Sequence, residues 1–334
     1  MTTQARPLVQ VGASAAFAFV FTMGIVNLFG DTTYEGGASI NGQFLSSLGA
    51  SAAAISIIAG AGEFLGYSLR SIAGWTADKT GVYALNTALD ETGATIGPLL
   101  IAFALYRHAS YRTGYSLLLI SASLAFVALI VARIVFPVPA KLEQGEPATK
   151  IEGFTPNFWL YMVAAACFGA GLMSFEFISV HFASHHTVNE QWIPIFLGIS
   201  TGFGVLANLV LGRLYDRAGI STVVGAVLVS ALFSPFVFLG SFGVALFGML
   251  LWGVGYATQD TLFKAIVADR LPEGRRNFAF GIFYTGYGGG WLIGSIATGL
   301  LYHVSVAAVI AFSMAVQLGS IPLFLFARRR ESTS

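Results

Sequence analysis

Two single carboxylates stand inside long apolar runs of this 334-residue chain. Glu63 lies in a segment of small residues (60–66), and Glu176 lies between Phe175 and Phe177. Apolar surroundings disfavour the charged form of a carboxyl group, so such a group can take up and release protons near physiological pH. Both residues are candidates for binding a substrate or coupling to protons, and Glu176 is the strongest single candidate. Its structural alternative is a carboxyl group hydrogen-bonded across helices.

Other acidic residues come in close pairs. Asp90 and Glu91 are adjacent, and because neighbours on a helix point about 100° apart, only one can readily face a cavity. A coupling role and a structural ion pair, for which Arg70 is a partner, are equally open for them. Asp31 and Glu35 stand at the end of the first apolar run, where they form either a vestibule that attracts cations or relays protons, or an acidic outer loop.

A third group combines basic and acidic side chains. Asp260 and Lys264 are four residues apart, which places them on one helix face as a local salt bridge or as part of a cytoplasmic gate. His181, His185 and His186 have the spacing of a weak metal site, but the surrounding sequence supplies no arranged supporting groups. We therefore expect no bound metal.

The composition limits the class of protein. The chain is 56% hydrophobic and 10% charged, with a mean hydropathy of +0.76. Several apolar runs exceed the length that a helix needs to cross a bilayer, and they are too long and too continuous for barrel strands. The sequence predicts an all-α, polytopic membrane protein whose first run is retained rather than cleaved as a signal peptide.

Several classes of partner and activity are excluded. The net charge of +1 gives no general attraction to nucleic acid, and the single cysteine, Cys167, excludes an internal disulfide. The sequence contains no nucleophile elbow, metal signature or phosphate-binding loop. We expect no enzymatic activity and no cofactor.

The runs predict about ten transmembrane spans. They are 12–30, 44–69, 83–105, 114–136, 156–180, 192–212, 220–239, 243–264, 278–300 and 304–327. A polar stretch divides the chain into an N-terminal half (1–137), a cytoplasmic linker (138–155) and a C-terminal half (156–334). Most Lys and Arg residues fall on one side if both termini are cytoplasmic, which is the expected orientation, in a bacterial or archaeal cytoplasmic membrane.

An eight-residue motif occurs once in each half. It reads G-x-x-x-D-[KR]-x-G, and its residues are Gly74, Asp78, Lys79 and Gly81 in the first copy and Gly212, Arg213, Asp216, Arg217 and Gly219 in the second. The last glycine permits a positive φ after a helix end, and the aspartate can pair with a basic neighbour as a latch that breaks and re-forms. The alternative is a set of ordinary loop charges.

The two halves differ in length. If the motifs are aligned, Gly93 and Gly97 in the first half correspond to Gly290 and Gly294 in the second, each pair suited to close helix packing. Gly286 extends the second set, which we expect to pack between the halves. The interval is 19 residues from Gly74 to Gly93 but 78 from Gly212 to Gly290, so the first half is short by 59 residues. This difference corresponds to about two spans.

The duplicated motif, the two halves and the polar central stretch resemble the major facilitator superfamily. The resemblance implies a two-half helical bundle of six plus six helices, here without the third and fourth helices of the first half. It also implies alternating access to a central site by rocking of the halves. In the family the first and fourth helices of each half line the cavity, so one lining helix would be missing.

Two functional hypotheses follow. The first is a secondary transporter of a small solute, a symporter or antiporter for which protons are the candidate coupling ion. The second is a transport-inactive member that serves as a membrane scaffold or as one subunit of an oligomer, in which lipid or a second copy fills the gap. The sequence does not identify the substrate.

Overall fold

The computed structural model describes residues 13–76, 84–108, 110–136, 154–269 and 276–331. Within these ranges the regular structure is helical, without strands. The first part of the chain forms α1 (Ala13–Ser47), α2 (Ala52–Thr76), α3 (Ala84–Tyr106) and α4 (Tyr111–Val135). The expected linker (138–155) falls almost wholly outside the described residues, and the expected division into halves stays a prediction.

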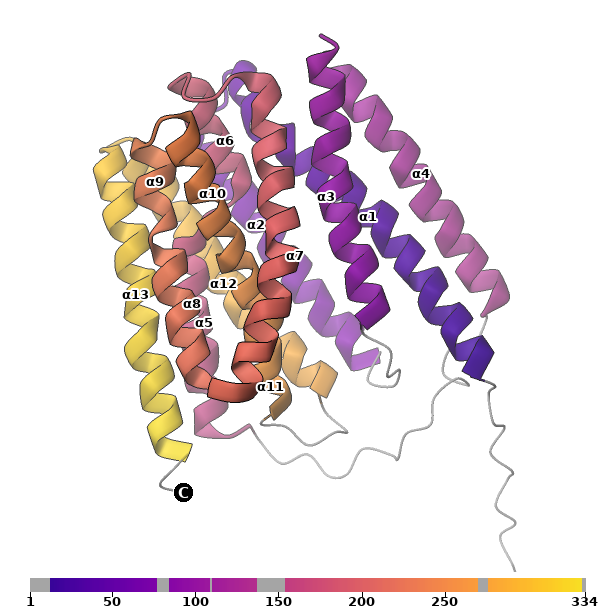
Figure 1. The fold of residues 1–334 in the computed structure, drawn as a ribbon, viewed down its shortest axis with the longest axis vertical. Helices are drawn as coiled ribbons and strands as arrows, with labels where there is room; N and C mark the ends of the chain where they lie inside the picture. Colours follow the sequence, from indigo (N-terminus) through magenta and orange to yellow (C-terminus); the bar gives the residue numbers. More distant parts are fainter. Residues whose placement is uncertain (1–12, 77–83, 109, 137–153, 270–275, 332–334) are drawn as a thin grey trace, which may run out of the picture.

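The second part of the chain is also helical, with short breaks. Its elements are α5 (Pro156–Leu172), α6 (Phe175–Ser184), η2 (Glu190–Trp192), α7 (Ile193–Ala218), α8 (Ile220–Ala231), α9 (Phe233–Leu239), α10 (Phe242–Ala257), η3 (Thr258–Phe263), α11 (Lys264–Asp269), α12 (Arg276–Tyr302) and α13 (Val306–Glu331). Figure 1 shows α1, α3 and α4 side by side, and α5 to α13 bundled next to them. We call the end where α1 begins and α13 ends the basal end, and the opposite end the distal end.

Within the part of the chain that the structure describes, six helical stretches are long and apolar enough to cross a membrane. They are Tyr111–Val135, Pro156–Ser184, Glu190–Ala218, Ile220–Leu239, Phe242–Asp269 and Val306–Arg330. Two shorter apolar helices, Ala52–Ser68 and Thr92–Tyr106, lie beside them. The polytopic all-α prediction is confirmed, and the count of ten spans stays a prediction.

The first helix is longer than expected. The sequence predicts that it ends near residue 30 and is followed by an outer loop over 31–43, but α1 continues without interruption to Ser47. That prediction was wrong because the polar residues lie on a helix that packs against other helices. Ile40 is fully buried, and Gly36 lies directly against Leu118 of α4.

The fifth predicted span is broken at Met173, which has a φ of 61°. A break inside an apolar bundle frees backbone carbonyls that must find other donors. The Trp252 indole lies 3.1 Å from the carbonyl oxygens of both Leu172 and Met173, and the Gln317 amide donates to the Gly171 carbonyl at 3.0 Å. Side chains of α10 and α13 therefore stabilise the break.

Glycines of α3 allow close contact with α1. The backbone of α1 at Leu28 occupies the place where a Cβ of Gly93 would stand, and the backbone at Thr32 does the same for Gly97. A larger residue at either position would push the two helices apart.

An equivalent contact joins α12 to α5. Gly290 lies against the backbone of Ala166, and Gly294 lies against the backbone of Ala170. Gly286 also faces α5. The expectation that these glycines pack between the halves is therefore wrong, because their contacts stay within the second half. The repeated geometry supports the sequence alignment of α3 with α12.

The contact between the halves involves other residues of α12. Gly60 of α2 lies against Ser295, and Gly288 of α12 lies against Tyr67. The Ser56 hydroxyl donates to the Ser295 carbonyl at 2.7 Å. These contacts hold α2 along the length of α12, whereas α2 touches α1 only slightly.

Toward the distal end, the α1–α3–α4 group contacts the second half. Gly198 of α7 lies beside Leu99 of α3, and Gly42 of α1 lies against the backbone of Glu176 at the start of α6. The Tyr111 hydroxyl donates to the Glu190 carboxylate at 2.9 Å.

The α5–α12 contact makes a prediction about stability. Gly294→Ala should lower the free energy of unfolding by about 1–3 kcal/mol, because the added methyl group meets backbone that cannot move aside. Gly319→Ala is the matched control, since nothing lies within 4 Å of that position on α13. Thermal unfolding in detergent, followed with a thiol-reactive dye at Cys167, measures both; equal midpoints for the two variants would contradict the packing described here.

Candidate functional site

A polar cavity of about 370 Å³ lies between α1, α2, α3, α7 and the α10–α11 segment. Such a cavity is notable because most helix faces of this bundle are apolar. Its lining residues are Asn27, Asp31, Tyr34, Glu35, Glu63, Tyr67, Ala94, Ser200, Thr201, Gly204, Asn208, Trp252, Gly253, Tyr256, Ala257, Gln259, Asp260 and Lys264.

The first two helices provide one wall. Asn27, Asp31 and Glu35 follow one another at four-residue steps along α1, so they share one helix face. Tyr34, also on α1, donates a hydrogen bond to the carboxylate of Glu63 on α2. This bond joins two helices that otherwise hardly touch.

The α10–α11 segment provides another wall. Trp252, Tyr256, Asp260 and Lys264 also follow at four-residue steps. Trp252 and Tyr256 have ring centroids 4.2 Å apart. The Lys264 ammonium lies 3.5 Å from the Asp260 carboxylate, which confirms the predicted local salt bridge.

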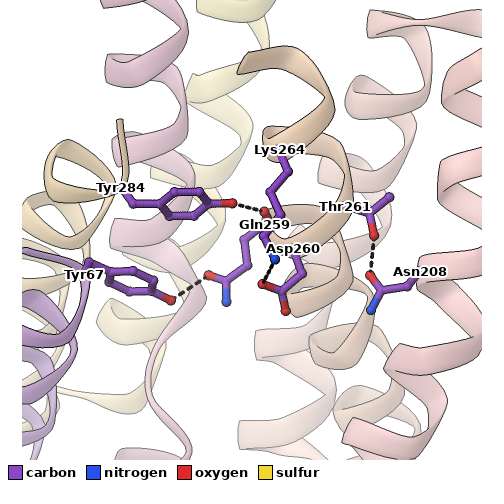
Figure 2. A network of polar contacts seen from close by, with 7 residues as sticks. All are labelled: Tyr67, Asn208, Gln259, Asp260, Thr261, Lys264 and Tyr284. Carbon is purple, nitrogen blue, oxygen red and sulfur yellow. Dashed lines mark hydrogen bonds and ion pairs between the residues drawn. The ribbon is translucent and has the colours of Figure 1, made fainter. Parts of the chain in front are cut away.

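A π-helical turn (Thr258–Phe263) positions this wall. The Tyr284 hydroxyl of α12 donates to the Gln259 carbonyl at 2.6 Å, and the Tyr67 hydroxyl of α2 donates to the Gln259 side chain at 3.3 Å. The Thr261 hydroxyl donates to Asn208 of α7 at 2.7 Å. Figure 2 shows that these contacts surround the turn from three helices. Wide turns of this kind often occur at functional sites, because they redirect side chains within a helix.

The lining is strongly acidic. It contains four carboxylates (Asp31, Glu35, Glu63 and Asp260) and, among the described basic residues, a single ammonium group, that of Lys264. Lys264 pairs with Asp260, and the other three carboxyl groups lie on the α1–α2 wall.

The structure brings three of the predicted coupling residues together. Asp31, Glu35 and Glu63 all line the cavity. Glu176 is half-buried in the first turn of α6, after the break, and is not part of this lining. Asp90 and Glu91 are in α3, and their side chains lie outside the described residues, as does that of Arg70.

The second copy of the duplicated motif ends α7 at the basal end. Gly212 packs against Thr261, and Gly219 has the positive φ, 55°, that a glycine after a helix end permits. Asp216 and Arg217 are exposed, and neither makes an ion pair within the described part of the chain. Arg213 is exposed and donates to the carbonyl one turn before it, at 3.2 Å.

The first copy is only partly described. Gly74 lies in α2, while Asp78, Lys79 and Gly81 lie outside the described residues. The latch that the motif suggests therefore stays a prediction for both copies.

The histidines lie away from the cavity. His181 is buried and its ring nitrogens lie 3.1 Å from the Tyr302 hydroxyl and 3.1 Å from the Phe238 carbonyl. His185 and His186 are exposed. Among the residues that the structure describes, no three His, Cys, Asp or Glu side chains converge as a metal-binding group.

Sequence reasoning missed several lining residues. Tyr67, Asn208, Trp252 and Tyr256 were not predicted as site residues, although each stands four residues from another lining residue on its helix. That four-residue repetition of polar and aromatic side chains was the available signal.

The bonds to the π-helical turn make a prediction. Tyr284→Phe should destabilise the protein by about 1–3 kcal/mol, because it leaves a buried carbonyl without its donor. Tyr67→Phe should have a smaller effect, since its bond is longer, and Tyr106→Phe, at an exposed position, should have none. Thermal unfolding in detergent gives the ranking; a Tyr284→Phe variant as stable as Tyr106→Phe would show that the bond contributes nothing.

Comparisons with known proteins agree with this architecture. The model of the major facilitator superfamily matches residues 5–264. An uncharacterized protein of Mycobacterium tuberculosis is 26% identical over 386 aligned positions, which cover 95% of this chain and 94% of the relative. An uncharacterized MFS-type transporter of Methanocaldococcus jannaschii is 24% identical over 259 positions, covering 73% of this chain and 63% of the relative.

Solved structures share the fold. The fucose:proton symporter of Escherichia coli has a TM-score of 0.53 and 16% identity, covering 95% of this chain and 98% of the symporter. A bacterial homologue of the iron transporter ferroportin, in an outward-facing state, has a TM-score of 0.52 and 17% identity, covering 96% of this chain and 92% of the homologue. The chain is therefore an integral, multi-pass membrane protein that belongs to the major facilitator superfamily, a family of transporters.

Proposed function

We propose that the protein is a secondary transporter that moves a small solute by alternating access. The observation that carries this proposal is the polar cavity enclosed by helices from both parts of the chain. Carboxylates within membrane-spanning helices are unfavourable unless they face a partner or a water-filled space, and in transporters they mark the path of substrate or ions. The site lies near the middle of the bundle, as expected for a binding site reached from alternate sides.

Proton coupling is part of the proposal. Glu63 accepts a hydrogen bond from Tyr34 of the facing helix, so a change in its protonation alters a link between α1 and α2. Glu176 stands where α1 crosses α6, beside Gly42. A proton taken up at either carboxyl group would change the charge at a helix contact, which is a direct route from protonation to movement.

The chain is proposed to lie in a bacterial or archaeal cytoplasmic membrane with both termini in the cytoplasm. Arg213, Arg217 and Arg328–Arg330 lie at the basal end of α7 and α13. Clusters of Arg and Lys favour the cytoplasmic side. The cavity would then face the cytoplasm through the basal end, while the α1–α6 and α3–α7 contacts would close the outer end.

The first half is proposed to lack its third and fourth helices. The alignment with the Mycobacterium tuberculosis relative spans 386 positions, more than the 334 residues of this chain, so the relative has residues that this chain lacks. The α3–α1 contact repeats the α12–α5 contact, which supports α3 as the counterpart of the fifth helix in the second half.

Without these two helices, the bodies proposed to move against each other are not the two sequence halves. Because α2 packs along α12 and barely touches α1, we assign α2 to the same rigid body as α5–α13. The second body consists of α1, α3 and α4. Transport would then involve rocking of these two bodies rather than of the two halves defined by sequence.

The transport proposal is tested in liposomes that contain the purified protein. A panel of radiolabelled small solutes should include one that enters faster than into protein-free liposomes, and an imposed proton gradient should drive its accumulation. Glu63→Gln and Glu176→Gln should each reduce gradient-driven accumulation by about tenfold or more, because the amide cannot carry the proton.

Asp269→Asn is the matched control for this experiment, since the exposed Asp269 lies outside the cavity lining and its bond to Tyr215 joins α11 to α7 within one proposed body. A folded protein that moves none of the panel would count against transport. Such a result would favour the inactive scaffold instead.

Cross-linking tests the assignment of α2. In a Cys167→Ser background, Ser56→Cys with Thr298→Cys should form a disulfide between α2 and α12, because the two hydroxyl oxygens are 3.4 Å apart. Transport should survive this cross-link, since both residues belong to one body. Thr95→Cys with Gly202→Cys should instead join α3 to α7, whose positions are in van der Waals contact, and should block transport.

Reduction of the α3–α7 disulfide should restore activity, which controls for damage by the substitutions. Loss of transport in the α2–α12 cross-linked protein, recovered on reduction, would show that α2 moves with α1.

A further inference from the structure

We infer that the distal end carries a binding site for a divalent transition-metal ion, Cu²⁺ or Zn²⁺, formed by His181, His185 and Tyr302. None of these three residues is in the lining of the polar cavity, so the site is separate from it. The inference therefore does not depend on the proposed transport function. The sequence alone predicts no metal, because it does not show that Tyr302 lies beside two of the histidines.

The two histidines stand on one face at the end of α6. His185 follows His181 by one helical turn, and its backbone N–H donates to the His181 carbonyl at 3.0 Å. Residues four apart on a helix are neighbours on its surface, and here the two imidazole rings have centroids 4.2 Å apart. Imidazole nitrogens are preferred ligands of Cu²⁺ and Zn²⁺. The pair therefore presents two suitable ligands to one point.

Tyr302, at the end of α12, adds a third donor atom. Its hydroxyl oxygen lies 3.1 Å from Nδ1 of His181 and 3.4 Å from Nδ1 of His185. Two ligands that each stand about 2.0–2.1 Å from a tetrahedral metal ion are about 3.3–3.4 Å from each other. The three atoms thus already have nearly the spacing that a shared ion requires. A search for three converging His, Cys, Asp or Glu side chains does not reveal this group, because its third member is a tyrosine.

The hydrogen bonding of His181 prepares its ring for a metal. Its Nε2 lies 3.1 Å from the Phe238 carbonyl oxygen of α9. A carbonyl only accepts hydrogen bonds, so Nε2 carries the proton and Nδ1 presents its lone pair toward Tyr302. Metal-binding histidines usually donate their other N–H to a carbonyl or a carboxylate, which fixes the ring. Because His181 is only 3% exposed, its ring is held in this orientation before an ion arrives.

His185 gives the ion access from the distal surface. Its Nδ1 lies 3.3 Å from the His181 carbonyl oxygen, to which it donates in the absence of metal. The side chain is exposed, so water can bond to Nε2 when Nδ1 turns to an ion, and water can complete the coordination. We therefore assign His181 as the fixed ligand and His185 as the exchangeable one. Tyr302, which keeps its proton, is the weakest of the three.

Metal binding by the full-length protein tests the inference. Protein without a His tag, in dodecyl maltoside near neutral pH, is titrated by calorimetry with Zn²⁺ and with Cu²⁺. At least one of these ions should bind at one site per chain. His185→Ala should lower the affinity by about tenfold or more, because an imidazole ligand is lost, and Tyr302→Phe should lower it by a smaller factor. His303→Ala is the matched control, since His303 is exposed at the same end and should be dispensable.

The EPR spectrum of bound Cu²⁺ identifies the ligands directly. It should show coupling to two imidazole rings in the wild-type protein and to one in His185→Ala. Because His185 is exposed, its substitution tests the site without disturbing the buried His181. Absence of saturable binding of both ions, or an affinity unchanged by His185→Ala, would overturn the inference. Loss of binding in His303→Ala or His186→Ala, with His185→Ala unaffected, would assign the ion to other histidines and also overturn it.

Discussion

The close contact between α2 and α12 is the constraint on which the rest of the structure depends. Gly60, Gly288 and Gly299 allow the two helices to approach at their backbones, and Ser56 adds a buried hydrogen bond. Because lipid is as apolar as the side chains, helices in a bilayer associate through such packing and bonding rather than through hydrophobic burial. With α2 held on α12, Glu63 and Tyr67 are directed toward α1 and α10, and the cavity forms between them.

Backbone groups that lose their regular helix bonds inside the bundle are also stabilised by contacts between helices. The break between α5 and α6 and the π-helical turn after α10 both disturb regular helix bonding, and both are supported by side chains from other helices. Trp252 serves the break and also lines the cavity, so the stability of the α5–α6 corner and the shape of the site are linked through one residue. Glu176, in the first turn after the break, is placed by the same corner.

The contact of α3 with α1 is equivalent to the contact of α12 with α5. In each pair the glycines of one helix, Gly93 and Gly97 of α3 and Gly290 and Gly294 of α12, lie against the backbone of the partner helix. The helix α2 packs along α12 and touches α1 only slightly. In the proposed transport cycle, the boundary between the moving bodies therefore differs from the boundary between the sequence halves.

Much of the fold could be predicted from the sequence, and less of the site. Apolar run length predicted membrane helices, because bilayer thickness and backbone bonding leave few options, and the duplicated motif indicated the family. Spacing alone predicted the Asp260–Lys264 pair, and position within or at the end of an apolar run marked Glu63, Asp31 and Glu35 as candidates. The sequence did not indicate that residues 31–43 are helical, that Gly286, Gly290 and Gly294 pack on α5, or that Trp252 and Tyr256 share a cavity with Glu63. These features depend on which helix faces which, and only the tertiary structure decides that, because one apolar helix face resembles another until its neighbour is in place.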